Sequence, residues 1–305
     1  MSRTICLTVI GLASFITAMI AGYRCWRAYE RINRMAREQE QRQRKYAGLF
    51  AVWPFLAGIM SGIVIICLCS KLIADGDKLY DPGQAVRTAL SIMAAGFVIV
   101  CGQFVITTIA LARCYPWNNK EKLLATETRL RKWSWIVNLL FQLLAAVIVV
   151  WANVQFRILG IGDHVIELGS WSSVITVLWL VAAANVVRLL DGIEGAANVL
   201  LLVAGVAIFY VTLGAGEHFL NALSIAVIGA ALASLRFNFF PARLPLVGTG
   251  TVFVGFIFAI LTVLARQKTV AALLLIFPMM LLVVLVGGAM LGFLERAMSA
   301  DGDDK

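Results

Sequence analysis

The sequence predicts an all-α polytopic integral membrane protein with about nine transmembrane helices and a small extracytoplasmic hairpin after the fourth. Of its 305 residues, 61% are hydrophobic and 14% are charged, whereas an ordinary soluble domain is roughly 45–50% apolar. Apolar runs close to the roughly 20 residues that cross a bilayer as a helix recur along the chain. Because backbone exposed to lipid must form its hydrogen bonds within its own segment, helices are the expected form of these runs.

The predicted helices follow one another along a single membrane domain, residues 1–305. They cover residues 4–23, 48–73, 86–112, 133–154, 171–190, 195–213, 218–235, 246–265 and 269–292. Residues 155–170 alternate apolar with polar and contain glycine, which favours a short hairpin over a further span. Between the helices we predict basic loops at 24–46 and 113–132, and after them a polar tail at 293–305.

Basic residues are distributed unevenly over the predicted loops. The 24–46 loop holds eight Lys and Arg against three Glu, and the loops on its side of the bilayer hold 19 of the 26 Lys and Arg. Because cytoplasmic loops of polytopic proteins collect these residues, we expect the N-terminus outside and the C-terminus inside a bacterial-type inner membrane. The same rule accounts for the formal net charge of +9, so we expect no nucleic-acid partner.

The stretch from Asn185 to Asn198 brings charge into an apolar setting. It reads N-V-V-R-L-L-D-G-I-E-G-A-A-N and places Arg188, Asp191 and Glu194 three residues apart. That spacing keeps side chains on nearly one face of a helix, and ionisable groups at the mouth of a membrane helix suggest a functional site. An ion pair between Arg188 and Asp191 that only stabilises the helix end is the simpler alternative.

A second polar loop, residues 236–245, is predicted on the same face of the membrane. From Leu235 to Gly255 the chain reads L-R-F-N-F-F-P-A-R-L-P-L-V-G-T-G-T-V-F-V-G. With the first stretch and the 113–132 loop, it brings three polar connections to the cytoplasmic side, which is the pattern of a binding site. Turn chemistry alone is the alternative explanation.

These two motifs resemble those of the polyprenyl-phosphate N-acetylhexosamine-1-phosphate transferases, of the glycosyltransferase family 4 type. This family includes the phospho-MurNAc-pentapeptide translocases and GlcNAc-1-phosphate transferases of cell-envelope synthesis, and carries N-x-x-N-L-x-D-G-x-D-G-L-A and L-x-x-N-x-x-P-A-K/R-x-F-M-G-D-x-G-S-x-x-L-G. The matching residues here are Asn185, Leu189, Asp191, Gly192, Glu194, Gly195 and Ala196 in the first motif, and Asn238, Pro241, Ala242, Arg243, Gly250 and Gly255 in the second.

The resemblance implies a reaction class. In the family, a lipid phosphate attacks the β-phosphate of a UDP-sugar, UMP leaves, and a lipid-diphosphate-sugar forms. Mg²⁺ bridges the diphosphate, and clustered Asp residues hold the metal and orient the nucleophile. Such phosphoryl transfer depends on neutralising charge and aligning the reacting groups more than on covalent help from the protein.

This chain departs from the family pattern at the acidic positions. The Asp-Asp pair before the fourth helix is absent, with Glu127 alone near its place, and Gly248 stands where the second motif has Asp. The second Asp of D-G-x-D-G is Glu194, and the second Asn of N-x-x-N is Arg188. Asp191 is therefore the one acidic position that matches, and the metal ligand if the chain has one.

We interpret these departures as an exchange of metal charge for guanidinium charge. Arg188, with Arg236 and Arg243, would bind a lipid phosphate or diphosphate directly, assisted by Asn185 and Asn238. Snorkelling of the arginines to lipid headgroups is the alternative explanation.

Two functions follow from the resemblance. In the first, the chain is a catalytically silent homologue that needs no cofactor. It binds polyprenyl phosphate or a lipid-diphosphate-sugar, or serves as a scaffold for a membrane protein partner or a homodimer in a cell-envelope pathway. In the second, it is an active transferase of UDP-sugar and polyprenyl phosphate that uses Mg²⁺, with Asp191 and Glu194 as its catalytic residues and Glu127 as a further candidate.

Overall fold

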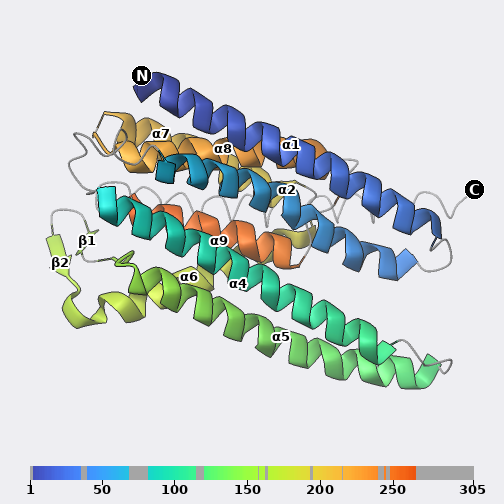
Figure 1. Ribbon diagram of the computed structural model, residues 1–305. Coiled ribbons are helices and arrows are strands. Elements are labelled where there is room, and N and C mark those ends of the chain that lie inside the picture. The colour runs from blue at the N-terminus through green and yellow to red at the C-terminus, as the bar shows by residue number, and fades with distance from the viewer. Residues whose placement is uncertain are drawn as a thin grey trace, which may run out of the picture.

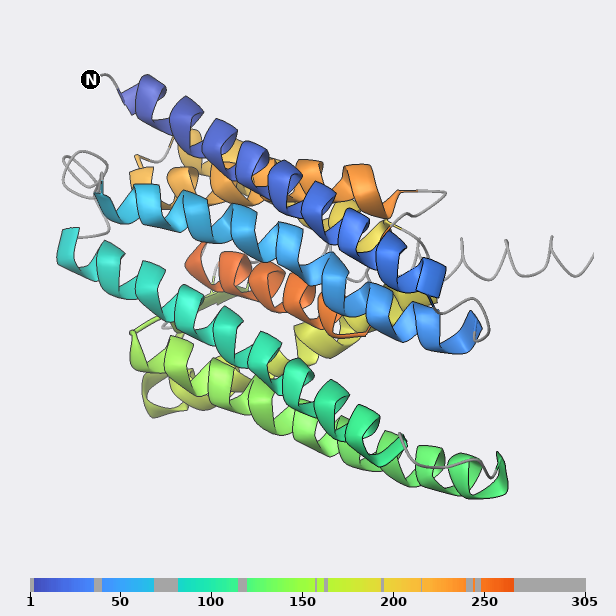
Figure 2. The same ribbon diagram turned by 45° about the vertical axis from the view of Figure 1, so that its right-hand side comes forward.

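In the computed structural model, the described part of the chain forms eight helices, which lie side by side in one bundle (Figures 1 and 2). The structure describes residues 3–35, 40–68, 82–114, 120–156, 158–161, 164–192, 195–214, 216–239, 244 and 248–265. The helices are α1 (Arg3–Met35), α2 (Glu40–Leu68), α4 (Pro82–Cys114), α5 (Lys120–Trp151), α6 (Ser172–Val187), α7 (Ala196–Leu213), α8 (His218–Asn238) and α9 (Thr249–Leu264). Shorter elements are the strands β1 (Ile158–Ile161) and β2 (His164–Glu167), and the 3₁₀ helices η1 (Gly169–Trp171) and η2 (Arg188–Gly192).

α9 occupies the middle of the bundle. It contacts α2, α7 and α8, which lie with α1 on one side, and α4 and α6, which lie with α5 on the other (Figure 1). Every described side chain from Gly250 to Ala265 is buried, although the segment is as apolar as a lipid-facing helix. The core of the described bundle is therefore built around α9.

The predicted helices from 4–23 to 246–265 all have counterparts among the described helices. Five of these are long and apolar enough to cross a membrane, and three shorter apolar helices, Leu56–Leu68, Ile136–Trp151 and Gly250–Leu264, accompany them. The chain is thus a helical membrane protein. The segments 269–292 and 293–305 lie outside the described residues, so the count of nine spans and the orientation stay predictions.

Three helices extend into sequence that was predicted as basic loop. α1 runs on to Met35, α2 starts at Glu40 and α5 starts at Lys120, so residues 24–35, 40–46 and 120–132 are helical. None of these segments contains Gly or Pro, and all three are rich in residues that favour helix, such as Arg in the first and Arg, Lys and Glu in the others. Hydropathy predicted where each helix leaves the apolar region, but it carries no information on where the helix itself ends.

The predicted hairpin after the fourth helix is present. β1 and β2 pair antiparallel, with Ile158 opposite Glu167. Just before the hairpin, the Phe156 backbone N–H donates to Thr176 Oγ1 at 3.0 Å, and the Ser172 hydroxyl donates to the Phe156 carbonyl. The base of the hairpin is therefore held by the first turns of α6. That it lies outside the cytoplasm stays a prediction.

Contacts along the helices show that the two motifs lie at one end of the bundle. Trp179 Nε1 of α6 donates to Thr262 Oγ1 of α9 at 2.9 Å, whereas Gly255 lies against Val187, so α6 and α9 run antiparallel. α7 and α8 are joined by residues 214–217 and also pack side by side. α6 and α8 thus end where α7 and α9 begin. We call this the motif end, and the opposite end the hairpin end.

A three-helix junction joins α1, α2 and α8. The Ser14 hydroxyl lies 2.7 Å from the Gly58 carbonyl oxygen and 2.6 Å from that of Ala226, so its proton can be donated to either neighbouring helix. A Cβ atom added to Gly229 would lie 2.6 Å from the carbonyl oxygen of Gly11. In lipid, where no hydrophobic effect drives helices together, such close backbone contact and shared hydrogen bonds are what hold them.

Exposed aromatic side chains mark both ends of the bundle. Trp151, Trp171 and Tyr210 are exposed at the hairpin end, and Tyr23, Trp53 and Phe239 at the motif end. Tryptophan and tyrosine gather at the two membrane–water interfaces. From Trp171 to Arg188 the helix rises about 26 Å, close to the roughly 30 Å of a hydrocarbon core. The motif end therefore lies at the depth of lipid headgroups.

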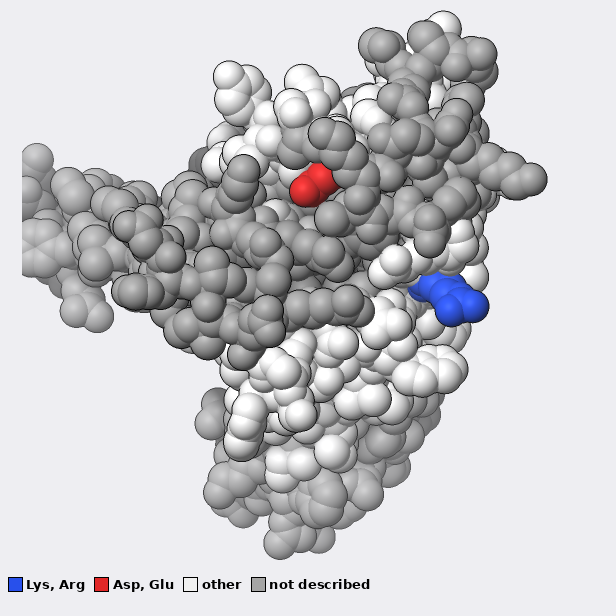
Figure 3. Space-filling view, turned by 90° about the vertical axis from the view of Figure 1, so that its left-hand side faces the viewer, with Lys and Arg blue, Asp and Glu red and all other residues white. Residues whose placement is uncertain are grey.

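The two ends differ in charge. Figure 3 shows the hairpin end, where the described surface carries one basic and one acidic patch and is otherwise uncharged. Among side chains that the structure describes, Arg87 near the start of α4 and Glu217 before α8 are the charged residues there. The other described arginine side chains, Arg24, Arg27, Arg188 and Arg236, belong to the motif end.

Leucine at position 229 should destabilise the fold. Its Cβ would clash with the Gly11 backbone, which cannot rotate away as a side chain can, so α1 and α8 must separate. Overpacking of this kind costs about 1–3 kcal/mol. We expect Gly229→Leu to lower the midpoint of thermal unfolding in detergent by several degrees.

Gly83→Leu is the matched control. Gly83 lies in the first turn of α4 with no atom within 4 Å of an added Cβ, so this variant should melt within a degree or two of wild type. Equal melting of Gly229→Leu and Gly83→Leu would show that the α1–α8 contact is not as close as described.

Candidate functional site

Four helix ends meet at the motif end. α6 ends at Val187 and α8 at Asn238, while α7 begins at Ala196 and α9 at Thr249. The residues before α7 and α9, Gly195 and Gly248, have no side chain that could cap the helix, and the first N–H groups of a helix have no partner within it. Helix dipoles add partial positive charge at these two N-termini and partial negative charge at the C-termini of α6 and α8. An anion is therefore favoured close to the starts of α7 and α9.

The first motif leaves the α-helical conformation earlier than predicted. α6 ends at Val187 instead of residue 190 and tightens into η2, Arg188–Gly192. In a 3₁₀ helix, residues three apart lie directly above one another, so Arg188 and Asp191 share one side of η2. The side chain of Asp191 and all of Glu194 lie outside the described residues, so the ion pair considered above stays untested.

The two motifs are in contact at Gly195, whose backbone has a left-handed conformation. Gly195 precedes α7 with φ +82°, a conformation that side-chain-bearing residues rarely adopt. A Cβ added here would lie 3.4 Å from the Phe239 ring and 3.5 Å from the carbonyl oxygen of Asn238. The end of the first motif therefore lies in van der Waals contact with the start of the second.

The second motif also touches the helix that leads into the first. A Cβ added to Gly255 would lie 2.8 Å from Val187 Cβ and 2.9 Å from Ala184 Cα. Only a glycine at position 255 lets α9 approach α6 this closely. The contact is with Val187, one residue before Arg188. Gly255 thus acts in packing: it holds η2 against the start of α9.

Gly248 stands at the N-terminus of α9 in a conformation restricted to glycine. Its backbone has φ +69° and ψ −107°, outside the regions open to L-residues with a Cβ. The Thr251 hydroxyl donates to its carbonyl oxygen at 2.7 Å. This is the position at which the resemblance implies a metal-binding Asp, so the backbone as well as the side chain departs from that pattern.

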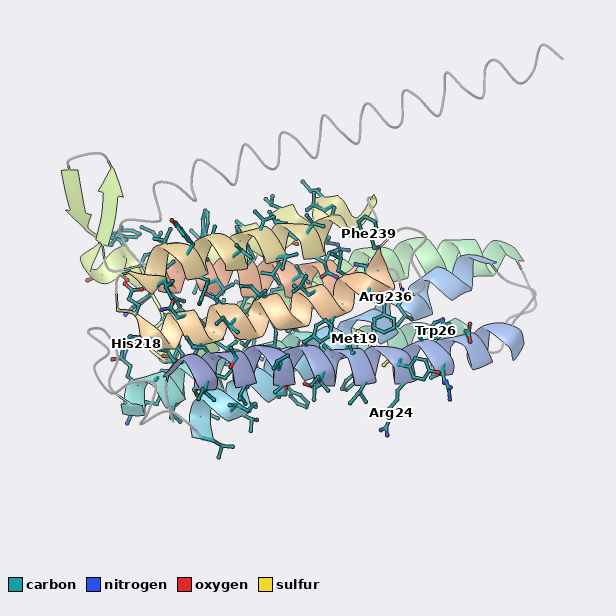
Figure 4. All side chains as sticks on the ribbon, turned by 90° about the horizontal axis from the view of Figure 1, so that it is seen from above. Met19, Arg24, Trp26, His218, Arg236 and Phe239 are labelled. Carbon is teal, nitrogen blue, oxygen red and sulfur yellow. The ribbon has the colours of Figure 1, made fainter. Side chains whose placement is uncertain are left out.

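Two described arginines lie at the ends of helices. Arg188 is the half-buried C-cap of α6, and Arg236 is exposed in the last turn of α8. Figure 4 places Arg236 and Phe239 at the end of α8 nearest Trp26 of α1, with His218 at the far end. Cations at helix C-termini are stabilising by themselves, so each guanidinium has a structural role besides any ligand.

Amide side chains form the interior of the site. Asn185 Nδ2 donates to Gln142 Oε1 of α5 at 2.7 Å and to the Val181 carbonyl oxygen at 2.8 Å. Asn198 Nδ2 donates to Ser234 Oγ at 3.0 Å, and both residues are buried. Asn185 was predicted, whereas Gln142, Asn198 and Ser234 were missed. The available signal was an amide or hydroxyl side chain inside an apolar run, about one turn from a motif.

The structure brings together part of the predicted set. Asn185, Arg188, Arg236 and Asn238 lie at the motif end, as does the backbone of Asp191. Arg243 and Glu194 lie outside the described residues, so their contribution stays a prediction.

Glu127 lies on α5, in sequence that was predicted as a loop. Its side chain lies outside the described residues, so its contribution to the site stays a prediction.

Fold and site together define a polytopic helical membrane protein whose polar connections meet at headgroup depth. Residues 129–266 match the model of glycosyl transferase family 4, which includes α6 to α9 and both motifs. This part of the chain, a little under half of it, is similar to that family, as the motifs predicted.

Curated relatives agree with this assignment. The chain is 31% identical over 133 residues to the probable undecaprenyl-phosphate N-acetylglucosaminyl 1-phosphate transferase of Bacillus subtilis (strain 168), covering 44% of this chain and 37% of that protein. It is 37% identical over 106 residues to the phospho-N-acetylmuramoyl-pentapeptide-transferase of Moorella thermoacetica, covering 34% and 33%. With that of Levilactobacillus brevis it shares 27% over 159 residues, covering 50% and 48%. The chain therefore spans about a third to a half of these relatives.

The described residues do not form a Mg²⁺ site. Within the described ranges, no three His, Cys, Asp or Glu side chains gather as they would around a metal ion. At position 248 there is no side chain to offer an oxygen. The side chain of Asp191 and all of Glu194 lie outside these ranges, so whether the chain holds Mg²⁺ stays a prediction.

Alanine at position 248 should test the glycine conformation. No atom lies within 4 Å of an added Cβ, so any effect of Gly248→Ala must come from the positive φ and not from a clash. Strain of this kind costs about 1–3 kcal/mol. We expect a lower midpoint of thermal unfolding in detergent.

Gly83→Ala is the control for the same substitution. Gly83 also has open space around its Cβ, but it lies in the first turn of α4 without a positive φ, so alanine should be neutral or slightly stabilising. A Gly248→Ala protein as stable as Gly83→Ala would mean that position 248 does not need glycine.

Proposed function

We propose that this protein binds a lipid-linked phosphate or diphosphate at the motif end and does not transfer sugar phosphate. The ligand class is polyprenyl phosphate or a lipid-diphosphate-sugar of cell-envelope synthesis, presented at the cytoplasmic face of an inner membrane. The observation that carries the proposal is Gly248. It lacks the carboxylate that the family resemblance implies, and it holds a backbone conformation that a residue with a carboxylate would adopt only under strain.

The backbone argument goes further than a missing side chain. A carboxylate lost by a single substitution could be regained by the reverse substitution if the backbone had kept its shape. Here Asp at position 248 would have to adopt φ +69° or rebuild the N-terminus of α9. The connection before α9 thus requires glycine at position 248. This supports a function of the site that does not use the family's metal chemistry.

Charge at the motif end supports a phosphate as the ligand. Arg188 and Arg236 supply guanidinium groups, which bind phosphate oxygens through paired hydrogen bonds. The N-termini of α7 and α9 lie at the same end, each preceded by a glycine, and helix N-termini bind phosphates in many folds. A ligand that is anionic overall matches all of these groups.

The depth of the site supports a lipid as the carrier of that phosphate. Arg188 lies about 26 Å from Trp171 along α6, which places it at the opposite membrane interface. Leu189 and Phe239, each beside an element that carries an arginine, are exposed large apolar side chains. A phosphate attached to an acyl or prenyl chain would meet guanidinium and apolar surface together. The name of the relative from Bacillus subtilis includes undecaprenyl phosphate. We extend that ligand class to this chain.

An active transferase is the second candidate, favoured by the similarity to named transferases. In that case Asp191 and Glu194 would hold Mg²⁺ between two phosphate groups, and the metal would supply charge neutralisation. A protein partner or a second copy of the chain becomes the main proposal if neither lipid binding nor transfer occurs.

Alanine at position 188 should weaken binding of undecaprenyl phosphate. Removing one charge-assisted pair of hydrogen bonds to a phosphate costs about 1.5–3 kcal/mol, so we expect a 10- to 100-fold rise in Kd. Binding would be measured by native mass spectrometry of protein released from detergent, with undecaprenyl phosphate added in EDTA. Arg188→Lys should recover part of the affinity, because it keeps the charge but loses the planar fork.

Arg87→Ala is the control, since Arg87 is exposed near the start of α4 at the hairpin end. It should bind as wild type does. If Arg188→Ala and Arg87→Ala bind equally well, Arg188 is not part of a phosphate site.

A second assay separates binding from transfer. We expect no UMP release when the protein is incubated with undecaprenyl phosphate, UDP-GlcNAc and Mg²⁺. UMP release that disappears in Asp191→Asn would establish the active transferase and overturn the silent function. The variant Gly248→Asp should not create activity, because the backbone at that position does not accommodate the added side chain without strain.

A further inference from the structure

Gln142 is a buried amide that the function proposed above leaves unexplained. It is 1% exposed, and it lies on α5 among the fully buried side chains of Ala145, Ala146 and Val149. Its Oε1 accepts the hydrogen bond from Asn185 Nδ2 at 2.7 Å. An amide in such an apolar setting is costly unless it is bonded. Keeping this polar contact at the α5–α6 interface therefore costs the protein hydrophobic packing at that position.

The contact determines which way the Asn185 amide faces. Nδ2 carries two hydrogens, and the structure gives each an acceptor: Gln142 Oε1 and the Val181 carbonyl oxygen at 2.8 Å. Val181 lies one turn back along α6, toward the hairpin end. Because the oxygen and nitrogen of a planar amide lie on different sides of Cγ, Oδ1 points away from these two acceptors.

Both donors of Asn185 are therefore engaged, and only an acceptor is left. A phosphate oxygen is itself an acceptor and has nothing to gain from Asn185 in this orientation. The group that Asn185 can bind is a hydrogen-bond donor, and in the part of the chain that the structure describes Oδ1 has no recorded donor. The residue was expected to bind phosphate from the sequence, so the structure changes its expected role.

We infer that Gln142 is a positioning residue that holds Asn185 as an acceptor for a hydroxyl group of the ligand. The inference rests on the proposed function, and it narrows the ligand class. Next to the phosphate or diphosphate that the arginines bind, the ligand carries an O–H donor. A sugar hydroxyl of a lipid-diphosphate-sugar supplies such a donor, and so does a water molecule on a hydrated divalent cation. Polyprenyl phosphate, a monoester, has no such donor in its dianionic form.

The experiment compares Gln142→Leu with Gln142→Glu. Leucine fills a similar volume but cannot accept from Asn185, so the amide is free to rotate. Glutamate keeps an acceptor oxygen at the same reach. We expect Gln142→Leu to weaken binding of undecaprenyl-diphosphate-GlcNAc about tenfold, the effect of one hydrogen bond, with undecaprenyl phosphate binding unchanged. Gln142→Glu should restore the affinity for the sugar-bearing lipid.

Measuring both lipids with and without Mg²⁺ distinguishes the two donor sources. A loss in Gln142→Leu that is the same in EDTA assigns the donor to the sugar. A loss seen for both lipids but only with Mg²⁺ assigns it to water on the cation. A loss that is equal for both lipids in EDTA, or that Gln142→Glu does not repair, means that Gln142 only supports the fold, and the inference is wrong.

Gln155→Leu is the matched control. Gln155 Oε1 accepts a hydrogen bond from the Ser173 hydroxyl at 2.8 Å, at the exposed hairpin end. The substitution removes the same kind of acceptor far from the motifs, and it should leave the binding of both lipids as in wild type.

A ligand-free measurement separates this inference from the proposed function. In protein labelled with ¹⁵N-asparagine, the Asn185 side-chain amide should exchange with D₂O slowly in wild type and Gln142→Glu and much faster in Gln142→Leu. Fast exchange in wild type overturns the inference even if lipids bind. Slow exchange without any lipid binding would leave Asn185 oriented as described while removing the proposed function.

Discussion

Close approach of helix backbones at glycine is the constraint on which the motif end depends. In lipid, two apolar helices gain little by exchanging lipid contacts for each other, so they associate where small residues let their backbones touch. Gly255 makes this contact between α9 and α6 beside Val187, and Gly195 makes a looser one with Asn238 and Phe239. These two contacts bring together segments that hydropathy alone treats as independent loops. Any site that uses both motifs exists because of them.

The same end of the bundle has its electrostatics set mostly by backbone geometry. The N-termini of α7 and α9 lack side-chain caps, and Arg188 and Arg236 stand at the C-termini of α6 and α8. Positively charged groups are thus present at this end, and a carboxylate cradle for a cation would have to form beside them. A phosphate would meet no such repulsion, which agrees with the proposed ligand.

Much of the fold could be predicted from hydropathy and turn chemistry. The helices from α1 to α9 and the hairpin at β1 and β2 fall where the apolar runs and the alternating segment put them. The ends of α1 and α5 were missed because charged sequence without Gly or Pro continues a helix after it has left the membrane. Asn185 and Arg188 were identified because they belong to a motif, whereas Gln142 was not, since a single amide in an apolar run does not show which helix it faces.

The sequence by itself determined that the chain is a helical membrane protein, which family its motifs resemble, and which acidic positions of those motifs it lacks, because composition and linear motifs depend on residue order alone. Only the tertiary structure decided that Gly248 has a backbone closed to other residues, that Gly255 packs against Val187, and that Gln142 accepts a hydrogen bond from Asn185. Each of these depends on dihedral angles or on a partner from another helix. Residues distant along the chain meet only when the bundle packs, so no local pattern could have revealed them.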